Sequence, residues 1–452
     1  MSNYSAVILA AGMGTRMKSD KSKVLHKICS KPLVKWVYEA CLGAGCGKTV
    51  MVVGHKKEDV IAEMGSDKLY AVQEQRLGTG HAVMMAEELL KGEKGTVVIL
   101  NGDTPLITAE TIKTAVEYHE AQGNSATVIS AVLDDPASYG RIIRDENGSF
   151  CCITEYKDAT EEQRAVCEIN SGMYCFDCED LFLALSKVTN DNVQKEYYLT
   201  DTMQILKDMG KKADAYVMTD SDEILGVNDR VDLAVAAAIM QKRINTALMK
   251  SGVTLIDPDN TYIDAEVSIA PDTIVYPGCH IRGNTVIGAE CEIGPSTTIE
   301  SCEIGSNTKI QNSVACDSKI GSCTSVGPFA YIRPNSDIGN HIKIGDFVEI
   351  KNSTIADGTK VSHLTYVGDS DVGEGVNFGC GTVTVNYDGK NKHRTVIGDN
   401  VFIGCNANLV APVTINDHAF IAAGSTITED VESDALAIAR ARQVVKSGWY
   451  KR

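Results

Sequence analysis

The sequence predicts two domains of different fold class, an α/β domain in its first half and a parallel β-helix in its second. Three observations support this prediction: apolar runs alternate with helical patterns near the N-terminus, a helix-forming segment follows, and aliphatic residues then recur every six positions. At 452 residues the chain is long enough to form two cores. We therefore divide it into four predicted segments, residues 1–227, 228–250, 251–437 and 438–452.

The first half has the pattern of a parallel sheet with helices on both faces. Strands that are continuous apolar runs are typical of such sheets, because both of their faces are covered. This pattern predicts an α/β nucleotide-binding domain. The predicted strands are residues 6–10, 50–53, 97–100 and 127–132, and the predicted helices are residues 33–43 and 109–122.

A single helix is predicted between the two domains. Residues 229–250 are rich in Ala, Leu, Met and long charged side chains, and Gly252 follows them, as expected for a helix of about six turns. We interpret residues 228–250 as a stiff linker. Residues 438–452 are expected to be helix-like or irregular, with most of their basic side chains solvated.

The second half contains three runs of aliphatic residues spaced six apart. No α-helix has this period, whereas one short strand and one sharp corner per six residues produce it. Glycine often follows the aliphatic residue, which suits a tight bend. The pattern predicts a parallel β-helix with a continuous core that must be capped at its ends. The runs are Ile263, Ile269, Val275, Ile281, Ile287, Ile293 and Ile299; Ile320, Val326, Ile332, Ile338, Ile344 and Ile350; and Ile397, Ile403, Leu409, Ile415, Ile421 and Ile427.

The charge and the cysteines limit the partners and the compartment. Sixty Asp and Glu against 43 Lys and Arg give a net charge of −17, which argues against a general nucleic-acid or anionic-membrane surface. With no signal-peptide pattern and no apolar stretch near the roughly 18 residues of a membrane span, we expect a cytoplasmic protein. Fifteen cysteines indicate reduced thiols. The one C-x-x-C, Cys175 and Cys178, is expected to pack as buried hydrophobic residues rather than bind zinc.

A glycine-rich string directly after the first strand is the first chemical signal. Gly12 and Gly14 let backbone N–H groups approach phosphate oxygens, Ala10 and Ala11 leave space for a nucleotide, and Arg16 adds a fixed charge. The string is neither a P-loop nor a complete dinucleotide fingerprint, so alone it is a weak signal.

With Lys23 in Ser22-Lys23-Val24-Leu25, this string resembles the sugar-phosphate nucleotidyltransferases. The family usually has proline where this chain has Ser22. The resemblance implies Arg16 and Lys23 as catalytic cations and a uracil-reading segment at Gln73 and residues 78–82. The implied nucleotide site comprises Leu9, Ala10, Ala11, Gly12, Gly14, Lys23, Gln73, Gly78, Thr79 and Asp103.

Asp103 follows the strand at residues 97–100, where open α/β sheets place their ligands. The resemblance pairs it with Asn228, and one carboxylate with one amide oxygen suits Mg²⁺. The same resemblance implies a site for the sugar phosphate at Gly140, Glu155, Asn170 and Asn228. The implied reaction is attack by a sugar 1-phosphate oxygen on the α-phosphorus of UTP, with release of pyrophosphate and without a protein nucleophile.

In the second half, the hexads break at residues 386–394, a polar loop with three basic residues. The hexads resemble the hexapeptide-repeat acyltransferases, whose β-helix is left-handed and whose assembly is a homotrimer. A lone histidine such as His363 is usually structural. His363, Tyr366, Asn377, Asn386, Tyr387 and Lys392 together, however, match the family of bifunctional N-acetylglucosamine-1-phosphate uridyltransferases and glucosamine-1-phosphate acetyltransferases.

This resemblance implies a role for each matching residue. His363 is the expected general base, and backbone N–H near Cys380 is expected to meet the oxyanion. Cys380 and Cys405 replace an alanine and a small hydroxyl residue, and we interpret them as packing substitutions rather than nucleophiles. The expected sugar-phosphate residues are Arg333, Lys351, Tyr366, Asn377 and Lys392. The expected acetyl-CoA residues are Cys380, Asn386, Tyr387, Cys405, Ala423 and Arg440.

The sequence thus predicts an enzyme that makes UDP-N-acetylglucosamine. Its expected substrates are glucosamine 1-phosphate, acetyl-CoA as co-substrate, N-acetylglucosamine 1-phosphate and UTP. Two alternatives are a monofunctional sugar-1-phosphate nucleotidyltransferase with a regulatory β-helix and a non-catalytic β-helix scaffold. The first leaves His363 and residues 386–392 without a role, and the second leaves Asp103 and the glycine loop unexplained.

Overall fold

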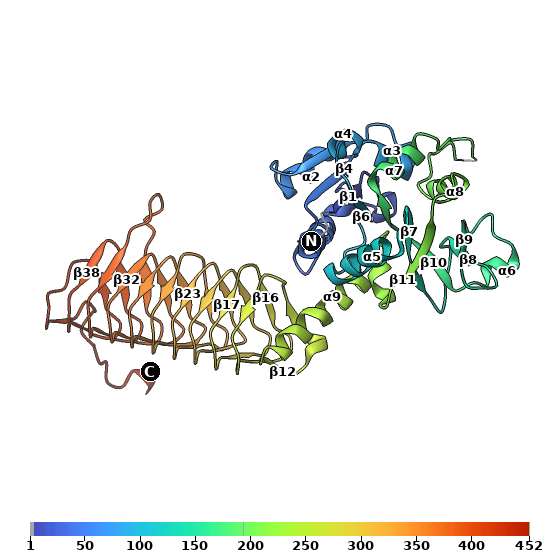
Figure 1. The fold of residues 1–452 in the computed structure, drawn as a ribbon. Coiled ribbons are helices and arrows are strands. Elements are labelled where there is room, and N and C mark those ends of the chain that lie inside the picture. The colour runs from blue at the N-terminus through green and yellow to red at the C-terminus, as the bar shows by residue number, and fades with distance from the viewer. Residues whose placement is uncertain (1–3, 193, 452) are drawn as a thin grey trace. The chain divides into compact units, whose positions relative to one another are not determined.

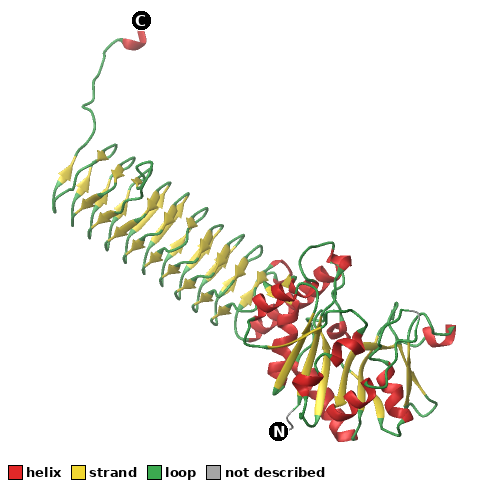
Figure 2. Ribbon diagram, turned by 90° about the horizontal axis from the view of Figure 1, so that it is seen from above, coloured by secondary structure: helices red, strands yellow, loops and turns green. Residues whose placement is uncertain are grey.

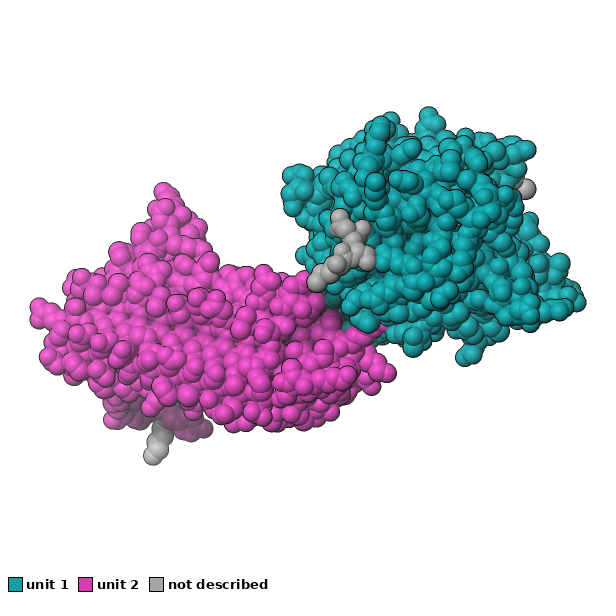
Figure 3. Space-filling view, in the orientation of Figure 1, with its two compact units in different colours: residues 1–240 teal, residues 241–452 magenta. Residues whose placement is uncertain are grey.

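The protein consists of two compact units, residues 1–240 and residues 241–452 (Figure 3). The structure is a computed structural model that describes residues 4–192 and 194–451. The division between the units lies inside helix α9 (Arg230–Lys250), at the segment predicted to be helical. Each unit is described below by itself.

The first unit is built on one twisted sheet. Its main path has the strand order β11-β7-β10-β6-β1-β4-β5, and β8 and β9 extend it beside β10 (Figures 1 and 2). The strands are β1 (Ser5–Ala10), β4 (Lys48–Val53), β5 (Leu69–Val72), β6 (Thr96–Asn101), β7 (Ala126–Val132), β8 (Arg141–Arg144), β9 (Phe150–Thr154), β10 (Glu168–Asp177) and β11 (Ala213–Val217). A separate hairpin joins β2 (Lys27–Ile28) to β3 (Lys31–Pro32).

The sheet that was predicted to be parallel is mixed in the structure, because it contains the antiparallel strand β10. This strand runs antiparallel to both of its neighbours, β6 and β7, whereas β1, β4, β5 and β6 pair in parallel. The reason is the connection: after β7 the chain turns back through the antiparallel pair β8 and β9 instead of a helical crossover, and β10 therefore enters the sheet from the opposite end.

Helices cover both faces of the sheet, as predicted. Alternate residues of β1 face two different cores, Ile8 with α1 and α5 on one side and Val7 with α3 and α7 on the other. The predicted strands and the two predicted helices of this unit are confirmed. The helices are α1 (Leu33–Ala44), α2 (Lys57–Met64), α3 (Thr79–Met84), α4 (Glu87–Leu90), α5 (Ala109–Gln122), α6 (Glu161–Arg164), α7 (Cys178–Leu185) and α8 (Asp201–Asp208). Cys175 and Cys178 are buried, as expected.

The second unit is a prism made of three stacks of short parallel strands (Figure 1). The first stack contains β12 (Thr254–Leu255), β15 (Ile274–Val275), β18 (Glu292–Gly294), β21 (Lys309–Gln311), β24 (Ser325–Val326), β27 (Lys343–Asp346), β30 (Lys360–His363), β33 (Asn377–Phe378), β36 (Phe402–Ile403), β39 (Phe420–Ile421) and β41 (Leu436–Ala437). The second contains β13 (Tyr262–Ile263), β16 (His280–Arg282), β19 (Thr298–Glu300), β22 (Val314–Cys316), β25 (Tyr331–Ile332), β28 (Glu349–Lys351), β31 (Tyr366–Gly368), β34 (Val383–Val385), β37 (Asn408–Val410) and β40 (Thr426–Ile427). The third contains β14 (Ser268–Ile269), β17 (Val286–Ile287), β20 (Glu303–Ile304), β23 (Lys319–Ile320), β26 (Asp337–Ile338), β29 (Thr354–Ile355), β32 (Ser370–Val372), β35 (Thr395–Ile397) and β38 (Val413–Ile415).

The aliphatic residues of the three predicted runs all lie in the continuous core of this prism. The runs slip where one corner is shorter, since Ile269 pairs with Ile287 on the next coil but Ile287 pairs with Ile304. The long polar loop at residues 386–394 is inserted between β34 and β35 and projects from the prism (Figures 1 and 3). The β-helix prediction is therefore confirmed.

The C-terminal part of α9 closes one end of the prism. Asn245 is buried and its side-chain amide donates hydrogen bonds to the carbonyls of Pro258 at 2.7 Å and Thr261 at 2.9 Å. Ile244 and Leu248 pack against the core. This end is thus capped, as a stacked repeat requires. No helix among the described residues is long and apolar enough to cross a membrane.

Candidate active sites

The glycine string follows β1 at the carboxyl end of the sheet. Gly14 has a φ of +61°, and a Cβ at this position would lie 2.4 Å from Cβ of Lys23, so both the backbone conformation and the contact require glycine. A Cβ on Gly12 would meet no atom within 4 Å, which leaves open space beside the loop. The loop therefore brings Lys23 to the end of β1 and leaves room beside Gly12 for a ligand.

Four predicted residues from three distant segments meet at this edge. The Lys23 ammonium forms an ion pair with the Asp103 carboxylate and lies 3.4 Å from Oδ1 of Asn228. Arg16 donates a hydrogen bond of 2.9 Å to the same oxygen of Asn228. A backbone hydrogen bond of 2.8 Å from Val227 to Asp103 fixes the two segments to each other.

Asp103 and Asn228 are also the residues predicted to hold a divalent cation. Their side-chain oxygens converge on one positive charge, the Lys23 ammonium. One carboxylate and one amide oxygen, completed by phosphate oxygens and waters, suit Mg²⁺. The pair therefore fits such an ion, although no group of three or more His, Cys, Asp or Glu gathers as a metal site within residues 4–192 and 194–451.

The predicted uracil-reading segment is held by hydrogen bonds to the chain around it. The Gln73 side-chain amide donates to the carbonyl of Gly78 at 3.0 Å, and Thr79 Oγ1 accepts from the backbone N–H of Leu199 at 3.2 Å. A Cβ on Gly78 would lie 2.5 Å from the carbonyl oxygen of Tyr197. Residues 196–201, to which no chemistry could be assigned from the sequence, hold this segment through hydrogen bonds such as that from Gly80 N–H to the Tyr197 carbonyl at 2.8 Å.

The residues predicted to hold the sugar also lie together. A Cβ on Gly140 would come within 3.5 Å of the Glu155 carboxylate and 3.6 Å of Asn170 Cβ. Asn170 Oδ1 accepts a hydrogen bond of 3.1 Å from the Tyr174 hydroxyl, which orients the amide. Gly140 thus leaves the space between Glu155 and Asn170 free of side-chain atoms.

Glu155 lines a pocket of about 290 Å³ with Thr154, Asp158, Tyr198 and Asp201 among its walls. Burial raises the pKa of Glu155, and the carboxylates of Asp158 and Asp201 raise it further. Burial likewise raises the pKa of Asp201. A pocket rich in hydroxyl and carboxyl groups suits a ligand that donates many hydrogen bonds, such as a sugar.

In the β-helix, three predicted cations come together on one outward face. Arg333 and Lys351 occupy matching positions after β25 and at the end of β28, on neighbouring coils. The Lys351 ammonium beside Lys392 lowers the pKa of Lys392, and Arg333 adds to this effect. Because the three positive charges repel one another, although Arg333 also pairs with Glu349 and Lys351 with Asp369, this face favours an anion such as a phosphate.

Asp369, which the sequence interpretation did not identify, organises this cluster. Its buried carboxylate lies 3.4 Å from the Lys351 ammonium and accepts hydrogen bonds from the Asn386 and Asn352 side chains. Burial opposes the charged form, but these hydrogen bonds and Lys351 lower the pKa of Asp369. Asn386 also donates to the Tyr366 hydroxyl at 3.3 Å. Such a partner cannot be recognised by local motif, because it lies one coil away from Lys351 and Asn352.

Four predicted residues and Asp346 form a column along one corner of the prism. Each member stands two positions after an inward residue, and these inward residues pair from coil to coil. Backbone hydrogen bonds of 2.8 Å, from Asn406 to Cys380 and from Gly424 to Cys405, link the coils there. We call this set the corner column; its members are Asp346, His363, Cys380, Cys405 and Ala423.

Asp346 is the second residue that sequence interpretation missed. His363 Nδ1 lies 2.8 Å from Asp346 Oδ1, and the two residues are register partners on β27 and β30.

Cys380 and Cys405 are exposed free thiols.

Three predicted residues are not joined to these clusters. Asn377 begins β33, in the same stack as the strand of His363, but its side chain makes no hydrogen bond to a described residue. Tyr387 is 56% exposed and its hydroxyl donates to Gly389 within the projecting loop. Arg440 is exposed, and its Cδ would lie 3.8 Å from a Cβ placed on Gly424, the residue after Ala423.

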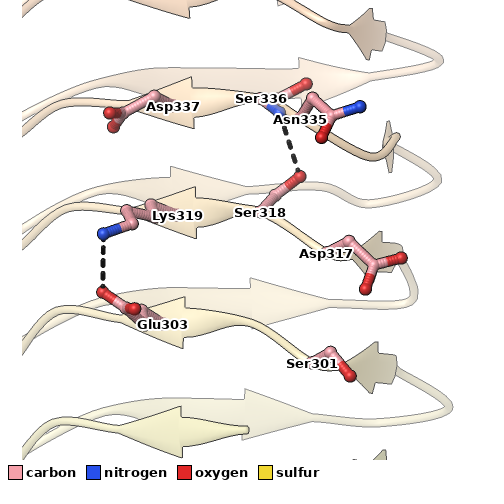
Figure 4. Close-up of a pocket in the computed structure, with 8 residues that line it drawn as sticks. All are labelled: Ser301, Glu303, Asp317, Ser318, Lys319, Asn335, Ser336 and Asp337. Atoms are coloured by element: carbon pink, nitrogen blue, oxygen red, sulfur yellow. Dashed lines mark hydrogen bonds and ion pairs between the residues drawn. The ribbon is translucent and has the colours of Figure 1, made fainter. Parts of the chain in front are cut away.

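A separate hollow of about 440 Å³ lies on the outer face of the third stack (Figure 4). Lys319 pairs with Glu303 of the neighbouring coil at 3.1 Å, and Ser336 donates its backbone N–H to the Ser318 hydroxyl. None of its residues was predicted to be functional. It is lined by Ser301, Glu303, Asp317, Ser318, Lys319, Asn335, Ser336 and Asp337.

Comparison with known families agrees with the two units. Residues 5–236 match the nucleotidyl transferase family, and residues 266–301 and 394–429 match the bacterial transferase hexapeptide repeat. Together with the three parallel stacks, the second match makes the prism a left-handed β-helix, as predicted.

Similar proteins cover nearly the whole chain. Proteins named "Bifunctional protein GlmU" are 56% identical in Acetivibrio thermocellus over 98% of this chain and 96% of that protein, and 57% identical in Caldanaerobacter subterraneus over 99% and 98%. The protein of that name from Clostridium acetobutylicum is 55% identical over 98% and 97%. A solved structure titled as a putative glucose-1-phosphate thymidylyltransferase from Bacillus anthracis in complex with a sucrose is 20% identical with a TM-score of 0.44, over 52% of this chain and 94% of its own.

Proposed function

Because this chain belongs to the family of the bifunctional protein GlmU, we propose that its two clusters of polar residues are the two active sites of that family's reactions. The protein is a bifunctional transferase that makes UDP-N-acetylglucosamine. Its β-helix acetylates glucosamine 1-phosphate with acetyl-CoA, and its first unit then transfers a uridyl group from UTP to N-acetylglucosamine 1-phosphate. The observation that carries the assignment is the presence of both clusters on one chain.

In the proposed uridyltransferase site, the chain acts by positioning and by charge. An oxygen of the sugar 1-phosphate attacks the α-phosphorus of UTP, and pyrophosphate leaves. Two polyanions must approach each other, and the Arg16 and Lys23 cations lower the repulsion between them. Glu155 and Asn170 would bind the sugar, and Gln73 with residues 78–80 would bind the uracil.

Asp103 and Asn228 would hold Mg²⁺, whose contribution when bound is to neutralise phosphate charge. The convergence of their oxygens on the Lys23 ammonium supports this assignment. The Lys23 ammonium, which forms an ion pair with Asp103, would also be within the region that binds phosphate.

In the proposed acetyltransferase site, the reaction is transfer of an acetyl group to nitrogen. The sugar amine attacks the thioester carbonyl carbon, the C–S bond breaks, and the CoA thiol leaves. His363 takes the proton that the amine loses, and backbone N–H near Cys380 stabilises the oxyanion. Arg333, Lys351 and Lys392 would bind the 1-phosphate, as the charge on their shared face supports.

A homotrimer is the proposed assembly, and an exposed apolar column beside His363 supports it. Phe329, Phe347 and Leu364 are each more than half exposed and all have positive φ, an unfavourable conformation for bulky residues. The rings of Phe329 and Phe347 stack at 5.6 Å. A second copy that covers this column would lie beside the His363 site and could supply Arg440 or Asn377 to it. The proposed compartment is the cytoplasm, which agrees with the fifteen free thiols.

The test is one assay that follows the two products separately. The protein is incubated with glucosamine 1-phosphate, acetyl-CoA, UTP and Mg²⁺, and free thiol and pyrophosphate are measured. Both are expected, with thiol release independent of UTP and pyrophosphate release dependent on prior acetylation. The monofunctional alternative would be favoured if the protein released pyrophosphate from UTP and added N-acetylglucosamine 1-phosphate but released no thiol from acetyl-CoA and glucosamine 1-phosphate.

A further inference from the structure

We infer that Asp346 is a positioning residue for acetyl transfer: its carboxylate holds the His363 imidazole so that Nε2 is the nitrogen that accepts the proton. The inference rests on the proposed role of His363 as the base. It adds a residue that lies outside the predicted acetyltransferase site and that no local sequence motif indicates.

The fold places Asp346 and His363 next to each other. They are register partners on β27 and β30, one coil apart, so their side chains leave the prism at the same corner. The backbone there is closely packed, because a Cβ on the preceding Gly345 would lie 1.8 Å from the Ser362 carbonyl oxygen. A backbone hydrogen bond of 2.9 Å from Leu364 to Asp346 fixes the two strand ends. The carboxylate is thus held at a constant place relative to the imidazole.

The contact itself sets the chemistry of the ring. Nδ1 of His363 lies 2.8 Å from Oδ1 of Asp346. A carboxylate can only accept a hydrogen bond, so Nδ1 must carry the proton and donate it. In the neutral ring, Nε2 is then the free base. The same hydrogen bond holds the pKa of Asp346 below its usual value, so the contact favours the charged carboxylate.

Little else restrains the histidine. Its side chain is 60% exposed, so packing does not select one rotamer. The other nearby carboxylates have partners of their own: Glu349 pairs with Arg333 at 2.7 Å, and Asp369 binds Lys351 and Asn386. Among the described residues, Asp346 makes the one side-chain hydrogen bond to this imidazole. Its carboxylate would also stabilise the positive charge that the ring acquires when it takes the amine's proton.

The test compares kcat and KM for acetyl transfer in the full-length Asp346→Ala protein. We expect kcat to fall about 10- to 100-fold, by analogy with carboxylates that orient metal-binding histidines, with unchanged KM for glucosamine 1-phosphate and acetyl-CoA. Asp346→Asn should recover part of the loss, because its Oδ1 can accept the same hydrogen bond without the charge. Asp357→Ala is the matched control, since Asp357 also joins two coils, through the backbone N–H of Asn340, but lies away from His363.

A double variant separates positioning from a general structural role. If Asp346 acts through His363, adding Asp346→Ala to His363→Ala should lower the residual rate no further. A full kcat in Asp346→Ala, a further loss in the double variant, or a change confined to KM would each overturn the inference. A different result would contradict the proposed function itself: a His363→Ala protein that acetylates glucosamine 1-phosphate at the normal rate.

Discussion

At the scale of single residues, Ser22 shows how one departure from a family pattern can be judged. Its side chain is fully buried and its hydroxyl has no hydrogen-bond partner among the described residues. Its φ of −54° is already the value that proline imposes. The turn that presents Lys23 is therefore kept in shape without proline, at the cost of an unpaired buried hydroxyl.

Ser22→Pro should stabilise the first unit. Because the native φ suits proline, the substitution removes freedom mainly from the unfolded chain, worth about 0.4–1 kcal/mol. Urea unfolding followed by the fluorescence of Trp36, which lies in α1, measures the change. Ser22→Ala is the control that removes the hydroxyl alone. A lower midpoint for the proline variant would show that the turn needs the residue 22 N–H or its present shape.

His119 should make the stability of the same unit depend on pH. Its ring is buried with Nδ1 2.8 Å from Thr127 Oγ1, and burial lowers its pKa to about 4. Between pH 6.5 and 4 only the unfolded chain binds this proton, so the stabilisation is complete above pH 6.5 and declines as the pH falls towards 4. At 1.36 kcal/mol per pH unit the loss approaches about 3 kcal/mol.

The measurement is the free energy of unfolding at pH 7.5 and pH 4.5 for three proteins. His119→Gln should lose less stability on acidification than the unchanged protein. His55→Gln, at an exposed histidine of the same unit, should behave like the unchanged protein. An equal pH dependence in all three would remove His119 as the cause.

Single residues also mark the limit of what the sequence could predict about the sites. Asp103 and the glycine loop belong to short motifs next to a strand, so the sequence alone could indicate them. Asp346 and Asp369 act on residues one coil away, and the coil length varies, as the pairs Ile269–Ile287 and Ile287–Ile304 show. The partner of His363 therefore depends on a register that is known only after folding.

At the scale of elements, the repeat was predictable and the direction of one strand was not. The aliphatic period follows from burial in the prism, which is a local property of each coil. The direction of β10 depends on how the chain returns after β7, and the apolar pattern of a central strand is the same in either direction. Periodicity thus predicts what is buried, whereas connections decide orientation.

The projecting loop offers a test at this scale. Tyr387 and Lys392 form a bridge across it, and Asp388 Oδ1 accepts the N–H groups of Lys390 and Asn391, which gives the loop a defined shape. Lys392→Ala should raise the KM for glucosamine 1-phosphate roughly 10- to 100-fold, since a charge-assisted contact contributes about 1.5–3 kcal/mol. The KM for acetyl-CoA should change little.

Lys390→Ala is the matched control, because Lys390 lies in the same loop and is exposed, and no hydrogen bond or ion pair joins its side chain to another described residue. It should leave both constants unchanged. If the two variants behaved alike, the loop's overall charge rather than the place of Lys392 would be responsible.

At the scale of the whole molecule, the two activities should separate by mutation. The proposed sites share no residue, and each lies inside one compact unit. Asp103→Ala should abolish pyrophosphate release from UTP and N-acetylglucosamine 1-phosphate while thiol release from acetyl-CoA continues at nearly the normal rate. His363→Ala should do the reverse and cost about 10²–10⁴ in acetyl transfer.

Both variants are assayed for both products, after circular dichroism and gel filtration have shown an unchanged fold and assembly. Loss of acetyl transfer in a correctly assembled Asp103→Ala protein would contradict the independence of the sites.

The one-coil spacing of the prism also bears on how such a protein can change over generations. Each strand pairs only with the strands directly before and after it in its own stack. Copying or deleting one complete coil, outside those that carry the acetyltransferase residues, would therefore preserve every remaining pairing and the cross-section of the core. The number of coils can therefore change during evolution. Pairs on neighbouring coils, such as Asp346 and His363, must be kept together if their contact is to survive.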